Sequence, residues 1–256
     1  MTTAPGGAER RPSLFAPLAA AFTFLTRLPL PGAAEVDAQT LARSSAWFPV
    51  VGAAVGGLGG LALVGASHLW TPFVASVLAV LTTVLVTGGF HEDALADAAD
   101  GLGGGWTRER VLEIMSDSRI GAYGAVALVL VLTARIGSIA AMSPLDGARA
   151  LVGAHVLARW SSLPLIRLLP YARAQGSGRP FAGAVTISRL LAGTLLASLL
   201  VAAALGRHAL PAGIAAAVVT GAAVGYFRAR LGGVTGDCLG ATNQIVELVT
   251  YLVVLV

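Results

Sequence analysis

The chain has 256 residues, of which 56% are hydrophobic and 12% charged, and its mean hydropathy is +0.80. This composition excludes an ordinary soluble domain and predicts an integral membrane protein that crosses the bilayer several times. The formal net charge of +4 comes from arginine, since the chain has no lysine, and we interpret it as a signal of membrane orientation rather than of nucleic-acid binding.

The chain begins with a polar leader over residues 1–13, which we expect to be poorly ordered. A short apolar segment follows over residues 14–30, and Arg27 interrupts it. A full span there would place the arginines of the leader outside the cell. We therefore expect an N-terminal helix that lies in the membrane interface or re-enters the membrane.

Seven longer apolar runs follow, each about long enough for one membrane-spanning helix. They are residues 47–69, 72–89, 120–142, 150–169, 190–205, 210–227 and 239–256. The sequence therefore predicts an all-α, polytopic membrane helix bundle of about seven transmembrane helices, forming a single membrane-embedded domain over residues 1–256. Glycines inside the runs, as in VGAAVGGLGG at residues 51–60, are expected to let helices pack closely.

Four long connections alternate with three short ones between these runs. The long connections are residues 31–46, 90–119, 170–189 and 228–240, and they hold nine arginines against two in the short ones. By the positive-inside rule we expect the long connections on the cytoplasmic side. They also hold most of the acids, as a site for phosphate and metal would, although an ordinary solvated face has the same composition.

The strongest local signal is GGFHEDALADAADG at residues 88–101. If the helix that begins at Pro72 continues through it, Asp93, Asp97 and Asp100 lie at i, i+4 and i+7 and form one carboxylate stripe. Carboxylates about 6 Å apart repel by about 3 kcal/mol at an effective dielectric constant of about 20, which favours a bound divalent cation such as Mg²⁺ over a solvated loop. His91 is either a structural hydrogen-bonding group or a catalytic base or ligand.

A second polar group closes the same connection. Asp117, Ser118 and Arg119 follow a short amphipathic segment at the edge of a predicted span. An arginine beside a serine suits a phosphate clamp, and Asp117 suits a metal ligand. An interfacial anchor and helix cap is an equally supported alternative.

A third group lies at the start of the last span and inside it. GGVTGDCLGATN at residues 232–243 places flexible backbone around Asp237. Glu247 lies two to three turns into the apolar run, where an ionised group costs about 2 kcal/mol or more, so we expect it to face the bundle interior with a partner. The candidate partners are Arg135, Arg159 and Arg167.

These motifs resemble those of the cobalamin synthase family, the adenosylcobinamide-GDP ribazoletransferases. The resemblance begins at FLTRLP, is most specific across residues 88–101 and the following LEIMSDSRIGAYGAVAL, and returns at TGDCLGATNQIVELV. It implies a multi-pass enzyme of the bacterial cytoplasmic (inner) membrane, dependent on Mg²⁺, with its active-site loops facing the cytoplasm. The implied partners are the lipid bilayer, adenosylcobinamide-GDP, and α-ribazole or α-ribazole 5′-phosphate, with release of GMP and no role for nucleic acid.

The resemblance also implies roles for individual residues. The implied catalytic residues are His91, Asp93, Asp97 and Arg119. The implied metal ligands are Asp93, Asp97, Asp100 and, as a weaker candidate, Glu92, where relatives often carry an apolar residue. The implied substrate-binding residues are Asp117, Ser118, Arg119, Asp237, Asn243 and Glu247. The chain departs from the family pattern at Ser116, where a basic residue is expected, and at Gln175 and Gln244, where an acid is common.

Two other functions stay open on the sequence. DAADG at residues 97–101 matches the opening of the CDP-alcohol phosphotransferase motif, but Gly104 and Gly105 replace its Ala-Arg and the later acids do not follow. A transporter would carry its acids near the membrane midplane, whereas here only Glu247 lies deep. The sequence also leaves open a homo-oligomer, the identity of the general base and the entry path of the corrinoid.

Overall fold

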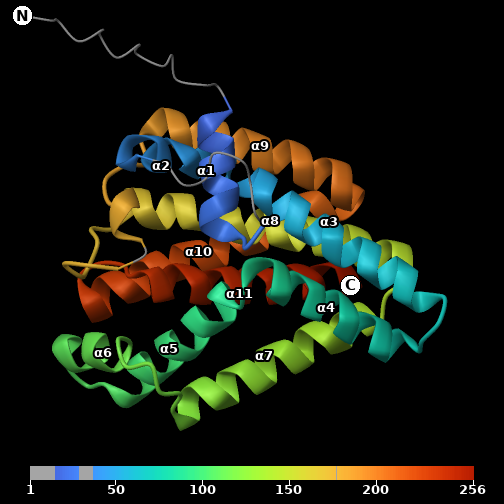
Figure 1. Cartoon of the computed structure of the whole chain (residues 1–256), viewed down its shortest axis with the longest axis horizontal. Helices are drawn as coiled ribbons and strands as arrows, with labels where there is room; N and C mark the ends of the chain where they lie inside the picture. Colours follow the sequence, from blue (N-terminus) through green and yellow to red (C-terminus); the bar gives the residue numbers. More distant parts are fainter. Residues whose placement is uncertain (1–14, 29–36, 177) are drawn as a thin grey trace, which may run out of the picture.

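The computed structural model describes residues 15–28, 37–176 and 178–256, and helices make up most of them (Figure 1). The helices are α1 (Ala16–Leu25), α2 (Ala38–Ser44), α3 (Phe48–Ser67), α4 (Pro72–Thr87), α5 (Phe90–Gly104), α6 (Arg108–Ile114), α7 (Ala122–Ala140), α8 (Pro144–Leu168), α9 (Ile187–Leu205), α10 (Ala209–Leu231) and α11 (Gly236–Leu255). The predicted all-α fold is confirmed for this part of the chain. The predicted polar leader, residues 1–13, lies outside the described residues.

The structure supports a multi-pass membrane bundle but does not confirm the count of seven spans. Within the described residues, four helical stretches are long and apolar enough to cross a membrane, and they contain α3, α7, the pair α9 and α10, and α11. The helices α4 and α5 would make a fifth only if they are counted together across a bend of 89°. The number of candidate spans is lower than seven for three reasons. The helix α4 alone has only 16 residues, and α8 carries four charged side chains. The helices α9 and α10 count as one stretch because only a short 3-10 turn at Gly206–His208 separates them.

The N-terminal helix α1 is apolar but has only 10 residues. At 1.5 Å per residue it rises about 15 Å, roughly half of the hydrocarbon thickness of a bilayer. Its length therefore agrees with the predicted interfacial or re-entrant helix rather than with a full span.

The helix α8 lies at the centre of the bundle, against α3, α9, α10 and α11 (Figure 1). Its contact with α3 depends on glycines spaced four residues apart on α3. A Cβ added to Gly52 would lie 2.7 Å from the carbonyl carbon of His155, and one added to Gly56 would lie 2.7 Å from the Cα of Val152. Two backbones can approach this closely only where no side chain separates them, as the glycine-rich sequence predicts.

Gly56→Ala should destabilise the bundle by about 1–3 kcal/mol, because its methyl group would overlap the backbone of α8. Gly57→Ala is the matched control, since a Cβ there meets nothing within 4 Å. That control should be neutral or stabilising by about 0.5–1 kcal/mol, the helix preference of alanine over glycine. Thermal unfolding of the purified variants in detergent measures the difference, and equal midpoints would contradict the close packing of α3 on α8.

Arginines join the long connections at one end of the bundle. Arg108 donates to the carbonyl oxygens of Leu231, at 2.8 Å, and Ala172, at 2.9 Å. Arg230 donates to the carbonyl oxygen of Trp106 at 3.0 Å. The Leu231 carbonyl is one that the end of α10 leaves without a helical partner, so the bond to Arg108 also caps that helix. Connections that are far apart in sequence thus lie together, as the shared face predicted from their charges requires.

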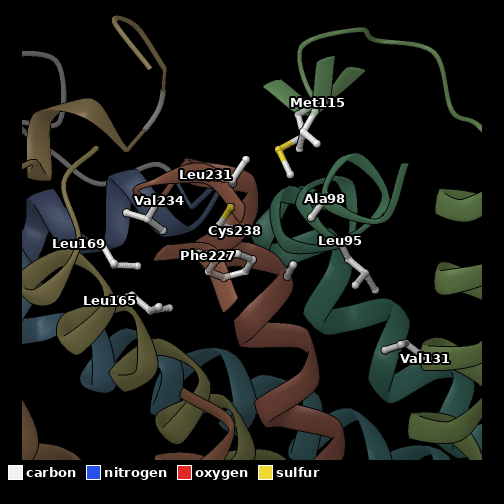
Figure 2. Close-up of a cluster of buried hydrophobic side chains, with 12 residues drawn as sticks. Leu95, Ala98, Met115, Val131, Leu165, Leu169, Phe227, Leu231, Val234 and Cys238 are labelled. Atoms are coloured by element: carbon white, nitrogen blue, oxygen red, sulfur yellow. The ribbon is translucent and has the colours of Figure 1, made fainter. Parts of the chain in front are cut away.

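A buried apolar cluster holds α5 and the C-terminal end of α6 against this end of the bundle (Figure 2). Leu95 and Ala98 of α5 belong to it, together with Phe227 of α10 and Cys238 of α11. Met115, at the end of α6, covers it. The free cysteine is therefore part of the packing, and the cluster positions the acidic helix α5 on α11.

Candidate active site

The acidic segment forms its own helix instead of continuing α4. The helix α4 ends at Thr87, and both Gly88 and Gly89 have positive φ, at 70° and 71°. Such left-handed backbone is accessible to glycine at little cost, and it turns the chain by 89° before α5 begins at Phe90. The helix that begins at Pro72 therefore does not continue through the acidic segment, and much of the predicted connection, residues 90–119, is helical.

A cavity of about 670 Å³ lies at this bend. Asp93 and Asp97 of α5 line it, one helical turn apart, as the predicted stripe requires. Ser118 lines it from the connection after α6, and Arg27 lines it from the segment after α1. Glu92 lines it as well. The fold thus brings together three of the four predicted metal ligands, one predicted substrate-binding residue and an arginine that precedes the acids by 65 positions or more.

The helix α11 adds a third carboxylate beside this pair. The helices α5 and α11 run antiparallel, since Gln244 donates to Glu92 at 3.0 Å and Gly240 packs against Ala94. One turn further along, this register places Asp97 near Asp237. The two carboxylates repel each other, and each also feels the charge of Asp93.

An arginine offsets part of this negative charge. Arg173, in the connection after α8, forms an ion pair with Asp237 at 2.9 Å. It also attracts Asp97. Sequence reasoning did not place Arg173 at the site, because an arginine 60 or more residues from its partner gives no spacing signal.

The third acid of the stripe, Asp100, has a different environment. It is buried, and its two oxygens accept hydrogen bonds from the backbone N–H groups of Gly121, at 2.7 Å, and Gly124, at 2.9 Å. Both N–H groups lie at the start of α7, where a carboxylate is favoured. Asp100 therefore fastens α7 to α5 and does not line the cavity with Asp93 and Asp97.

Glu92 also lines the cavity, and its carboxylate takes part in a buried charged network. Arg135 of α7 lies 3.3 Å from Glu92 and donates to Gln244 at 2.6 Å. Arg135 also pairs with Glu247 at 2.7 Å, and Arg159 of α8 pairs with the other oxygen of Glu247. The predicted inward position of Glu247 is confirmed with two of its three candidate partners.

His91 and Asn243 lie behind the cavity rather than in it. His91 is buried and lines a smaller space of about 20 Å³, room for about one water molecule. Its Nδ1 has no hydrogen-bond partner among the described residues. Asn243 borders the same space and donates to Ser161, at 3.2 Å, and Ser162, at 3.0 Å.

Asp117 and Arg119 pair with each other on the exposed connection before α7. The Arg119 guanidinium lies 2.6 Å from the Asp117 carboxylate, and its hydrogen bonds lower the pKa of Asp117 to about 2. Of the segment 117–119, Ser118 is the residue that borders the cavity. Arg119 itself is not among the described residues that line the cavity with Asp93 and Asp97.

The described residues contain no group of three or more His, Cys, Asp or Glu side chains arranged to hold a metal ion by themselves. Asp100 binds the start of α7, and Glu92, which also lines the cavity, is paired with Arg135, so Asp93 and Asp97 are the two cavity carboxylates without an ion pair among the described residues. Mg²⁺ is commonly held by one or two carboxylates together with substrate phosphates. Two mutually repelling carboxylates on one cavity wall fit such a shared site.

Known proteins of one family match nearly the whole chain. A profile described as cobalamin-5-phosphate synthase matches residues 17–255. A protein of Shewanella pealeana named adenosylcobinamide-GDP ribazoletransferase is 43% identical over 244 residues, which cover 92% of this chain and 93% of the relative. A protein of Azorhizobium caulinodans with the same name is 43% identical over 259 residues, covering 96% of this chain and 98% of the relative. No solved structure matches.

Proposed function

The chain belongs to the cobalamin-5-phosphate synthase family, and we propose that it is an adenosylcobinamide-GDP ribazoletransferase with its active site in the cavity at the α4–α5 bend. The enzyme joins adenosylcobinamide-GDP to α-ribazole or its 5′-phosphate in a late step of cobalamin biosynthesis. The oxygen of a ribazole hydroxyl group forms a bond to the phosphorus next to cobinamide, and the bond from that phosphorus to the bridging oxygen breaks. GMP leaves with the bridging oxygen, and the hydroxyl proton is released to solvent.

The observation that carries this assignment is the pair Asp93 and Asp97 on one wall of the cavity, beside Ser118. Phosphoryl transfer concentrates negative charge on the phosphoryl oxygens, so its sites need cations placed in advance. These two carboxylates would hold Mg²⁺ together with the diphosphate of the substrate. When bound, the ion would neutralise charge that develops on the phosphoryl oxygens and on departing GMP.

The other residues of the site have positioning roles in this proposal. Ser118, which lines the cavity from the connection after α6, offers a hydroxyl group to a phosphate oxygen. The ion pair of Arg173 with Asp237 holds the connection after α8 against the start of α11, beside Asp97. Asn243 and Glu247 support α11 from within the bundle, through Ser161, Ser162 and the buried arginines. In this proposal Asn243 and Glu247 do not contact the substrate; they hold α11 in position.

We place the enzyme in the bacterial inner membrane with the cavity facing the cytoplasm, where nucleotide-linked substrate is available. The arginine-rich connections at the cavity end of the bundle support this orientation by the positive-inside rule. A cysteine at Glu109, in a background where Cys238 is replaced, should react only with a membrane-permeant thiol reagent in intact cells. Labelling by an impermeant reagent from outside would reverse the orientation.

The full-length protein purified in detergent tests the activity directly. With adenosylcobinamide-GDP and α-ribazole it should release GMP and form a cobalamin in equal amounts, both measured by chromatography. Chelation of divalent cations should stop both products, and added Mg²⁺ should restore them. Absence of GMP release by folded protein with Mg²⁺ and both substrates would overturn the assignment, and corrinoid uptake into vesicles without GMP release would favour a transporter instead.

A further inference from the structure

The chain after α1 is anchored to the bend where the acidic helix begins. The backbone N–H of Arg27 donates to the carbonyl oxygen of Val86 at 2.8 Å, one residue before the end of α4. Thr26 closes α1 just before it, through a hydrogen bond from its hydroxyl group to Phe22 at 2.7 Å. Arg27 is therefore held against the α4–α5 bend by its backbone, independently of its side chain.

The side chain of Arg27 crosses the face of Gly88. A Cβ added to Gly88 would overlap the guanidinium Nε of Arg27 and lie 2.8 Å from its Cδ. The glycine thus has two reasons to be there: its φ of 70°, and the space that the arginine occupies. The missing side chain lets the guanidinium reach the cavity that Asp93 and Asp97 line.

Arg27 differs from the other arginines around the site because no ion pair or side-chain hydrogen bond is found for it among the described residues. Arg119 is paired with Asp117, Arg173 with Asp237, and Arg135 with acids of α5 and α11. Arg27 lines the same cavity as Asp93 and Asp97 without pairing with either. An arginine and two carboxylates that share a cavity but do not pair leave room between them for a group that can bind both.

The charges identify that group. A diphosphate that bridges two alcohols carries about two negative charges, and it would meet two more on Asp93 and Asp97. One divalent cation cancels only half of the total, so a fixed positive charge on another part of the wall is needed. A guanidinium presents paired N–H donors that match phosphate oxygens. We propose that Arg27 binds the diphosphate of the nucleotide-linked substrate, in the role that the sequence suggested for Arg119. This inference rests on the proposed function.

Steady-state kinetics test whether Arg27 or Arg119 binds the diphosphate. Arg27→Gln should raise the KM for adenosylcobinamide-GDP by about tenfold or more, the usual effect of losing a hydrogen bond to a charged group. The KM for α-ribazole should stay within about twofold, because the acceptor does not share this contact. Arg27→Lys should recover part of the loss, since it keeps the charge but not the fork. Arg119→Gln should change the donor KM much less, and Arg149→Gln, at the opposite end of the bundle, is the control for loss of charge.

A pair of glycine variants moves Arg27 without changing it. Gly88→Ala and Gly89→Ala introduce the same methyl group at φ of 70° and 71°, so both incur a similar backbone strain. Only the first displaces Arg27, because a Cβ on Gly89 meets nothing within 4 Å. The donor KM should therefore rise more in Gly88→Ala than in Gly89→Ala, at comparable thermal stability of the two proteins.

Equilibrium binding of adenosylcobinamide-GDP to each full-length protein with Mg²⁺ gives a readout that does not need turnover. Weaker donor binding in Arg27→Gln and Gly88→Ala, with partial recovery in Arg27→Lys, supports the inference. Wild-type donor binding by Arg27→Gln, or a larger loss in Arg119→Gln, overturns it while the wild-type enzyme still releases GMP. A wild-type protein that binds the donor and releases no GMP would instead contradict the proposed function and leave the binding comparison valid.

Discussion

Asp93→Asn and Asp97→Asn should each lower the rate of GMP release by about 100-fold or more, a loss typical of removing a charge-stabilising group from a catalytic site. Each change removes one negative charge from the cavity wall and keeps the shape of the side chain. The remaining carboxylate would have to hold the cation alone. The rate is measured at saturating concentrations of both substrates, over a titration of Mg²⁺.

The same variants should fold at least as well as the parent protein. Asp93, Asp97 and Asp237 repel one another, so removing one charge relieves repulsion in protein without metal. A lost rate at an unchanged or raised unfolding temperature therefore identifies a functional pair. Glu109→Gln, on the exposed surface of α6, controls for the loss of an acid at this end of the bundle. Activity within a fewfold of wild type in both variants would return Asp93 and Asp97 to the alternative of a solvated acidic face.

Glu247→Gln should destabilise the bundle by about 3–5 kcal/mol, the usual cost of leaving a buried charge without its partner. Glu247 is fully buried and faces two arginines that are also buried, Arg135 and Arg159. Glutamine fills almost the same space but leaves most of their positive charge uncompensated. Denaturant or thermal unfolding in detergent measures the loss.

The control for Glu247 is an ion pair of the same kind on the surface. Arg110 and Glu113 lie 2.8 Å apart on α6 and are both exposed. Glu113→Gln should change stability by no more than about 0.5 kcal/mol, since water screens the pair. If Glu247→Gln had an effect as small as Glu113→Gln, water or an anion would have to reach Arg135 and Arg159, which would contradict the buried network.

This network also explains two departures from the family pattern. Gln244 stands where an acid is common, and Glu92 stands where an apolar residue is frequent. The two side chains contact each other and the same guanidinium, that of Arg135. The negative charge that α11 lacks at Gln244 is thus supplied from α5 by Glu92.

Composition and hydrophobic runs were enough to predict a polytopic all-α bundle. A bilayer admits only segments whose backbone polar groups are internally bonded, so long apolar runs have to become helices. Helical periodicity likewise placed Asp93 and Asp97 on one face, because residues four apart are neighbours on any α-helix. It also required an inward position for Glu247, since an ionised side chain is not stable against lipid. These conclusions depend on local geometry and on the solvent, which the sequence contains or implies.

Only the tertiary structure decided which side chains share the cavity. Asp100 continues the stripe of Asp93 and Asp97 in sequence, yet it binds the start of α7, because that helix happens to begin beside it. Arg119 follows the acids closely but pairs with Asp117, whereas Arg27 reaches the cavity from more than 60 residues away. The bend at Gly88 and Gly89 and the antiparallel contact of α5 with α11 set these distances. Contacts between distant helices depend on packing of the whole chain, and no local spacing in the sequence records them.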